Sequence, residues 1–170
     1  MKKLFILVLT ISTLGCASVS SYSDVHINDR IELNQNLGIQ PNDARVSIQY
    51  GKVLSHAAIK NYYPHCWFVS WQRKDQPQII HKDIFIITKV RQLTSVVRIK
   101  SGAYPLAALL SQAGISAMEY TTEMEIYSER QAVIKKLICS HWEDPYNASH
   151  LSLQSMQKTL GDIATIRSSN

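Results

Sequence analysis

Apolar and polar residues alternate most regularly at residues 44–50, whose sequence is ARVSIQY. The even-numbered members, from Ala44 to Tyr50, would share one face of an extended chain, and the polar members would share the other. A period of two is typical of a strand with one face buried and one in water. We therefore predict a half-buried strand here, ended by Gly51.

Further segments predict strands by composition or alternation. Residues 66–71 are aromatic and apolar on both faces, which indicates a central strand. Residues 84–90 are rich in β-branched side chains, and the chain is expected to turn before a continuation at 96–99. Residues 120–126 alternate again, and residues 133–139 form the last predicted strand.

The C-terminal region predicts a helix that starts after Ser152, a good N-cap residue. Helical spacing places one apolar stripe along it: Leu153, Met156, Leu160 and Ile163. Gly161 falls within this pattern, where it would cost the helix about 1 kcal/mol relative to Ala. Residues 101–117 are rich in small and apolar side chains and predict a short helix or a long excursion between strands.

Many short strands with one convincing helix indicate a mainly β fold. We predict a small antiparallel sandwich or open barrel with the C-terminal α-helix packed on it. This single β-rich domain is expected to span residues 31–170.

The first 15 residues have the form of a bacterial lipoprotein signal peptide. Lys2 and Lys3 precede a largely apolar stretch at 4–14, which is too short to span a bilayer about 30 Å thick. The stretch ends at Gly15-Cys16, which resembles the box in which a small residue precedes a lipidated cysteine. We therefore expect cleavage before Cys16 and lipid on its sulfur.

Lipidation would place the chain in the bacterial envelope. Residues 16–30 then form the lipidated cysteine and a flexible, serine-containing tether. Bacterial lipoproteins generally carry two or three acyl chains, enough for firm anchoring. Ala17 follows the cysteine instead of the Asp that favours inner-membrane retention, which favours the outer membrane, with the domain on the periplasmic side.

Net charge gives little support for a polyanionic partner. The chain carries 18 Lys and Arg against 13 Asp and Glu, and loss of Lys2 and Lys3 leaves 16 − 13 = +3. There is no run of five or more basic residues. We therefore expect no nucleic-acid partner.

Two cysteines remain after the lipidated one, Cys66 and Cys139. An even remainder in an oxidising compartment indicates one disulfide. The alternatives are a metal site that also uses His65, His141 and His150, and a nucleophilic cysteine with a histidine base. The metal spacing is poor, and we predict the disulfide, with no metal and no cofactor.

Other candidate chemistry is sparse. The sequence lacks a Gly-rich phosphate loop, a Gly-x-Ser-x-Gly elbow and a His-Glu-x-x-His motif. Glu123 and Glu125 could serve as an acid/base pair, but a solvated strand face explains them better. Trp67 and Trp71 share a strand face by parity, and we expect them in the core, not in a carbohydrate-stacking platform.

Several stretches resemble an uncharacterised lipoprotein family of Gram-negative bacteria that has a paired-cysteine β domain. They are residues 39–51, 63–66, 137–145, 150–152 and 160–161. The resemblance covers roughly 33–166, with 101–117 as an unmatched loop. The family carries no assigned activity, so the resemblance implies an architecture and leaves the function open.

Taken together, these features predict a non-enzymatic outer-membrane lipoprotein with a binding, structural or assembly role. Its partners would be the membrane, through the lipid, and an envelope protein or peptidoglycan. The alternatives are an envelope enzyme that uses a Cys/His pair and a metal-binding periplasmic protein.

Overall fold

The computed structural model describes residues 24–98, 116–145 and 149–169. Strands dominate the described part of the chain: β1 (Arg30–Leu33), β2 (Leu37–Ile39), β3 (Arg45–Gln49), β4 (Lys52–Leu54), β5 (His65–Ser70), β6 (Gln78–Ile80), β7 (Asp83–Arg98), β8 (Ser116–Tyr127), β9 (Ile134–Glu143) and β10 (Ala164–Arg167). The helical elements are a 3-10 turn, η1 (His56–Ala58), and the helix α2 (Leu153–Leu160).

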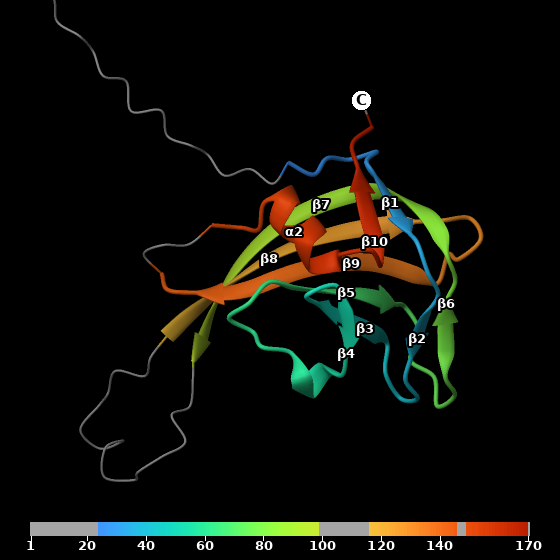
Figure 1. Cartoon of the computed structure of the whole chain (residues 1–170), viewed down its shortest axis with the longest axis horizontal. Helices are drawn as coiled ribbons and strands as arrows, with labels where there is room; N and C mark the ends of the chain where they lie inside the picture. The colour runs from blue at the N-terminus through green and yellow to red at the C-terminus, as the bar shows by residue number, and fades with distance from the viewer. Residues whose placement is uncertain (1–23, 99–115, 146–148, 170) are drawn as a thin grey trace, which may run out of the picture.

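Eight strands form one curled antiparallel sheet in the order β10-β1-β7-β8-β9-β5-β3-β4, and β2 pairs with β6 beside it. The sheet is a half-barrel, with α2 packed on it against β3, β5 and β10 (Figure 1). The mainly β class and the C-terminal helix are therefore confirmed. Of the two predicted architectures, the open barrel is the correct one, because a single sheet curls instead of two sheets stacking.

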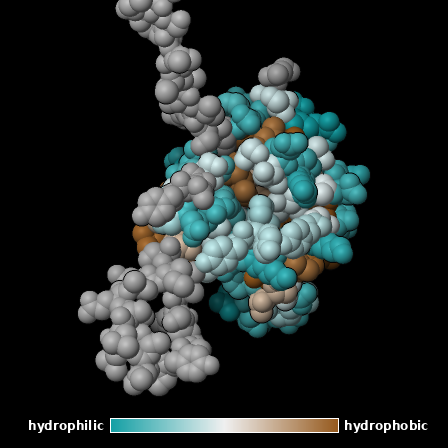
Figure 2. All heavy atoms as spheres, turned by 60° about the vertical axis from the view of Figure 1, so that its left-hand side comes forward, coloured by the Kyte–Doolittle hydropathy of each residue, from teal (hydrophilic) through white to brown (hydrophobic). Residues whose placement is uncertain are grey.

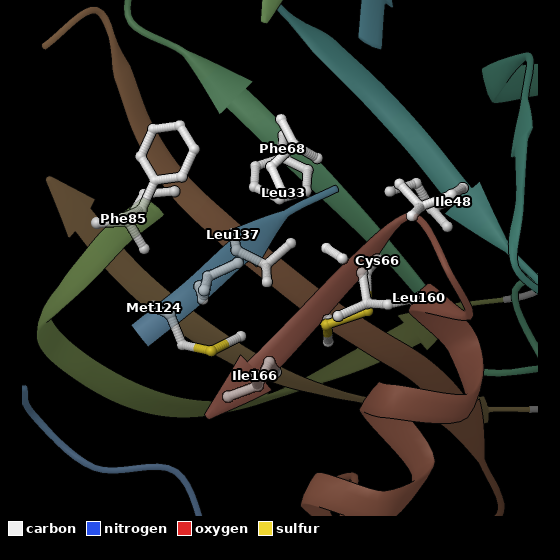
Figure 3. Packing of buried hydrophobic residues seen from close by; sticks show 14 of the residues in the cluster. Leu33, Ile48, Cys66, Phe68, Phe85, Met124, Leu137, Leu160 and Ile166 are labelled. Atoms are coloured by element: carbon white, nitrogen blue, oxygen red, sulfur yellow. A yellow bond between two sulfur atoms is a disulfide. The ribbon is translucent and has the colours of Figure 1, made fainter. Parts of the chain in front are cut away.

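The core lies on the concave face of this sheet. Phe68 and Phe85 are fully buried, with ring centroids 6.2 Å apart, although they come from separate strands. Leu160 of α2 points towards Cys66 and its disulfide (Figure 3). The helix thus closes the open side of the half-barrel over the sheet.

Strand β3 lies where the alternation predicted it, but the half-buried interpretation is wrong. Val46 and Ile48 face the core, and the polar Ser47 and Gln49 on the other face are buried as well. The outer face of β3 is covered because the chain between η1 and β5 folds over Gln49. Tyr50, predicted to lie on the core face, follows the strand and is 55% exposed.

The two strands predicted at 84–90 and 96–99 are one strand, β7, whose described part runs without a turn to Arg98. It pairs with β8 along most of its length, with a bulge at Thr88. The bulge adds one residue to β7, so the inward-facing parity changes at that point. The polar residues after the bulge led to the prediction of a turn. Hydrogen bonding to β8 keeps this segment extended instead.

The C-terminal helix starts as predicted, with the Ser155 amide donating to the Ser152 hydroxyl at 3.2 Å. It is shorter than its apolar stripe suggested, because α2 ends at Leu160. Gly161 follows with φ 56° and ψ −136°, which only glycine adopts readily. Ile163 is buried beyond the helix, and the chain continues as β10, a strand that the sequence analysis missed.

Gly161 also lies in unusually close contact with the backbone of the β3–β4 turn. A Cβ atom built at this position would come within 2.7 Å of the Gly51 Cα atom. Gly161→Ala is therefore expected to lower the free energy of unfolding by about 2–3 kcal/mol, through backbone strain and this clash. Chemical denaturation measures the loss. Gly38→Ala is the control, since a Cβ there meets nothing within 4 Å, and equal effects of the two changes would contradict the account.

The folded domain begins earlier than residue 31. Val25 is buried in the core, and the Asn28 amide donates to the Ile87 carbonyl at 2.8 Å, so the end of the predicted tether belongs to the domain. The signal peptide, Cys16 and nearly all of the 101–117 segment lie outside the described residues. No helix in the described part of the chain is long and apolar enough to cross a membrane.

Candidate functional site

Cys66 and Cys139 form a disulfide between neighbouring strands. They are directly opposite in the β5–β9 register, with Cα atoms 4.0 Å apart, and both residues are fully buried. The predicted pairing is therefore confirmed. Neither cysteine has a free thiol in this state. Neither can therefore act as the nucleophile of a Cys/His enzyme or as a thiolate ligand of a metal.

The two histidines next to the cysteines lie on opposite faces of the sheet. His65 is on the outer face, with its ring stacked 5.1 Å from that of Trp67, whereas His141 is on the inner face beside Tyr120. Burial lowers the pKa of both imidazoles. In the described ranges, no group of three or more His, Cys, Asp or Glu side chains could hold a metal ion.

The lowered histidine pKa values predict a pH dependence of stability. In the unfolded chain His65 and His141 titrate near pH 6.5, so below that pH the unfolded state binds more protons than the folded state. Stability should therefore fall as the pH is lowered from 7.5 to 5, by at most about 1.4 kcal/mol per pH unit for each histidine. Urea denaturation at both pH values measures this, and the double change His65→Gln and His141→Gln should reduce the slope; an unaltered slope would contradict the assignment.

Glu123 and Glu125, the pair considered for acid/base chemistry, are both in ion pairs on the outer face. The Lys136 ammonium donates to both carboxylate oxygens of Glu123 at 3.2 Å, and the Arg91 guanidinium donates to Glu125. These cross-strand ion pairs join β8 to its neighbours β7 and β9.

Asp83 is the most perturbed carboxyl group described. Burial alone would raise its pKa, but hydrogen bonds from Gln131, Ser128 and Arg130 outweigh burial and hold the pKa well below its ordinary value. The Ser128 hydroxyl donates at 2.7 Å and the Arg130 guanidinium at 2.7 Å. These hydrogen bonds occupy both carboxylate oxygens of Asp83. The carboxylate therefore links the start of β7 to the β8–β9 hairpin.

The tryptophans do not form the buried pair predicted from parity. Trp67 is half-buried on the outer face, and Trp71 is 76% exposed, with the Lys135 ammonium 5.7 Å from its ring centroid. Strand β5 ends at Ser70 after a register shift, so the two-residue parity does not extend to Trp71.

The face in Figure 2 is mainly hydrophilic, with hydrophobic residues in small separate groups.

The buried side-chain amide of Gln49 positions the loop before β5, which contains Tyr62 and Tyr63. The Gln49 side-chain amide donates to the carbonyls of Lys60, Tyr63 and Pro64 at 3.0–3.3 Å, and its oxygen accepts from the Lys60 amide at 3.1 Å. A buried amide with both ends satisfied fixes the backbone around it. The loop is thereby held with Tyr63 half-exposed at its surface.

Tyr50 lies opposite this loop in a left-handed backbone conformation. Its φ is 54°, a region that non-glycine residues seldom occupy, and its ring centroid is 5.9 Å from that of Tyr63 at 58°. Desolvation, and secondarily Tyr63, raise the pKa of Tyr50 above its ordinary value. The conformation belongs to the two-residue β3–β4 turn formed by Tyr50 and Gly51, which requires positive φ at both residues and presents the tyrosine ring to solvent.

The two tyrosines line a groove of about 430 Å³ between the loop and α2, which we call the aromatic groove: Tyr50, Tyr63, Pro64, Ser155, Lys158 and Thr159. The Gly51 amide donates to the Thr159 carbonyl at 2.9 Å, so the β3–β4 turn is hydrogen-bonded to α2 beside the groove. Its volume is within the range of small-molecule sites. Among its lining residues Lys158 is the one with a full charge.

Comparisons of the chain with protein-family models, with curated proteins and with solved structures found no match. The candidate site therefore depends on the geometry of this chain alone. Sequence reasoning identified the cysteine pair but missed the aromatic groove. Two features of the sequence could have indicated the groove. They are the Tyr62-Tyr63-Pro64 run and a large aromatic residue immediately before Gly51 at a turn.

Proposed function

We propose that this chain is an outer-membrane lipoprotein, anchored by lipid on Cys16, whose β domain faces the periplasm. The domain binds another envelope component and catalyses no reaction. The observation that carries this proposal is the sequence of the first 16 residues, in which a basic start and an 11-residue, largely apolar stretch are followed by Gly15-Cys16.

The structure supports a location in the cell envelope in one respect. Disulfides persist in oxidising compartments such as the periplasm and are rare in the reducing cytosol. A buried Cys66–Cys139 disulfide is therefore expected of an exported domain.

The binding role has its support in the aromatic groove. Tyr50 and Tyr63 keep about half of their surface exposed while flanking a supported hollow, and aromatic residues of this kind are enriched at binding surfaces. A Cys/His enzyme would need a free thiolate next to a base. Both sulfur atoms are instead bonded to each other and buried.

The anchor is tested by the change Cys16→Ser. The variant should no longer incorporate labelled fatty acid when expressed in a Gram-negative bacterium, and it should leave the membrane fraction because it has lost its acyl chains. Metabolic labelling followed by fractionation measures both effects.

Cys66→Ser is the matched control for this experiment, because it also removes one thiol but leaves the proposed lipidation site intact. It should still be labelled. Persistent labelling of Cys16→Ser would contradict the lipoprotein assignment.

A further inference from the structure

The aromatic groove has the form of a site for a sugar ring. One face of a pyranose presents C–H groups, which pack favourably on the electron-rich face of an aromatic ring. The Tyr50 and Tyr63 rings meet at 58° beside the hollow, so they offer two non-parallel walls to such a ring. The Tyr50 and Ser155 hydroxyls supply groups that can donate to or accept from sugar hydroxyls.

The residue type at position 50 gives a second indication. Tyr50 and Gly51 form the two-residue β3–β4 turn between the paired residues Gln49 and Lys52, and both have positive φ, as such a turn requires. Asn or Gly fits the first position of this turn better than a bulky aromatic residue, and the Tyr50 ring is 55% exposed. The turn itself therefore does not account for an aromatic ring at the rim of the groove.

The charge of the groove favours a ligand that carries a carboxylate. Lys158 lies on the exposed side of α2 at the groove, and none of the described lining residues is acidic. A carboxylate on the ligand could therefore pair with the Lys158 ammonium without repulsion from the wall.

We propose that the aromatic groove binds peptidoglycan, with a sugar ring of the glycan strand against Tyr50 and Tyr63 and a carboxylate of a stem peptide at Lys158. The inference deepens the proposed function and depends on it, because the anchor determines which glycan the domain meets. Residues 16–24, fully extended, would reach about 30 Å from the outer membrane. On the periplasmic side that the proposed function assigns to the domain, this span leaves the groove free to meet peptidoglycan.

The test is co-sedimentation of the detergent-solubilised, full mature protein with purified, protein-free sacculi. The wild type should sediment with sacculi. Tyr50→Asn removes the ring at a φ that Asn tolerates, and it should weaken binding about five- to tenfold without loss of stability. Tyr50→Phe keeps the ring and loses only the hydroxyl, so it should bind more tightly than Tyr50→Asn, and Lys158→Glu should weaken binding.

Trp71→Ala is the control, since it removes an exposed aromatic ring outside the groove. It should bind as the wild type does. Absence of wild-type sedimentation, or equal binding by wild type, Tyr50→Asn and Lys158→Glu, would overturn the proposal. Binding to lipopolysaccharide vesicles but not to sacculi would also overturn it. None of these outcomes changes fatty-acid labelling at Cys16, so the proposed anchor stands or fails separately.

Discussion

Replacement of either disulfide cysteine by serine is expected to lower the free energy of unfolding by about 2–5 kcal/mol. The bond joins residues 73 positions apart, so it greatly restricts the unfolded chain, and on chain-entropy grounds the stabilisation is roughly 4 kcal/mol. Cys66→Ser and Cys139→Ser should have similar effects, because each breaks the same bond. Denaturation of the oxidised proteins in urea measures the loss.

The double variant tests whether the two residues act as a pair. It should be little less stable than either single variant, and a reducing agent should lower the stability of the wild type by a similar amount. Cys16→Ser is the control and should leave the stability of the domain unchanged. Clearly additive losses at Cys66 and Cys139 would contradict a shared bond.

Leu160→Ala is the second change with a large expected effect, a loss of about 2–5 kcal/mol. The Leu160 side chain is fully buried at the end of α2, where it points towards the disulfide between β5 and β9 (Figure 3). Truncation leaves a cavity between the helix and the sheet that rigid strands on the other side cannot fill. Thermal and chemical denaturation should both register it.

Leu153→Ala is the matched control within the same helix, because Leu153 is only partly buried. Its loss should be clearly smaller than that of Leu160→Ala. Equal losses at the two positions would show that α2 does not pack on the sheet through Leu160.

The parts of the fold that could be predicted are those in which a local pattern and the final environment agree. Residues 120–126 alternate in sequence, and in β8 the members from Tyr120 to Ile126 do alternate between the core and the outer face. Ser152 caps α2 as expected because capping depends on the nearest few residues. The disulfide followed from cysteine count and compartment.

The errors arose where distant contacts decide the structure. Gln49 is polar, so its alternation indicated a solvent-facing position, yet the loop at Lys60–Pro64 covers and satisfies it. Gly161 ends the helix because the chain must pass close to Gly51, a contact that helical periodicity does not register. Strand β10 has only four residues and derives its stability from pairing with β1 at the other end of the chain.

The aromatic groove is another product of distant contacts. Tyr50, Tyr63 and Lys158 come from three separate segments, and no spacing in the sequence relates them. The sequence shows a run of aromatic residues before Cys66 and a tyrosine at a turn. Neither feature indicates that these residues lie close together in the fold.

In the proposed function this chain is an exported, lipid-anchored protein whose domain contains a closed disulfide. The most direct test is the intact mass of the wild-type protein extracted from the membrane fraction without reducing agent. We expect the mass of residues 16–170 with acyl lipid attached at Cys16, reduced by the two hydrogen atoms lost when Cys66 and Cys139 form their bond. A chain that retains residues 1–15, lacks lipid or carries two free thiols would contradict it.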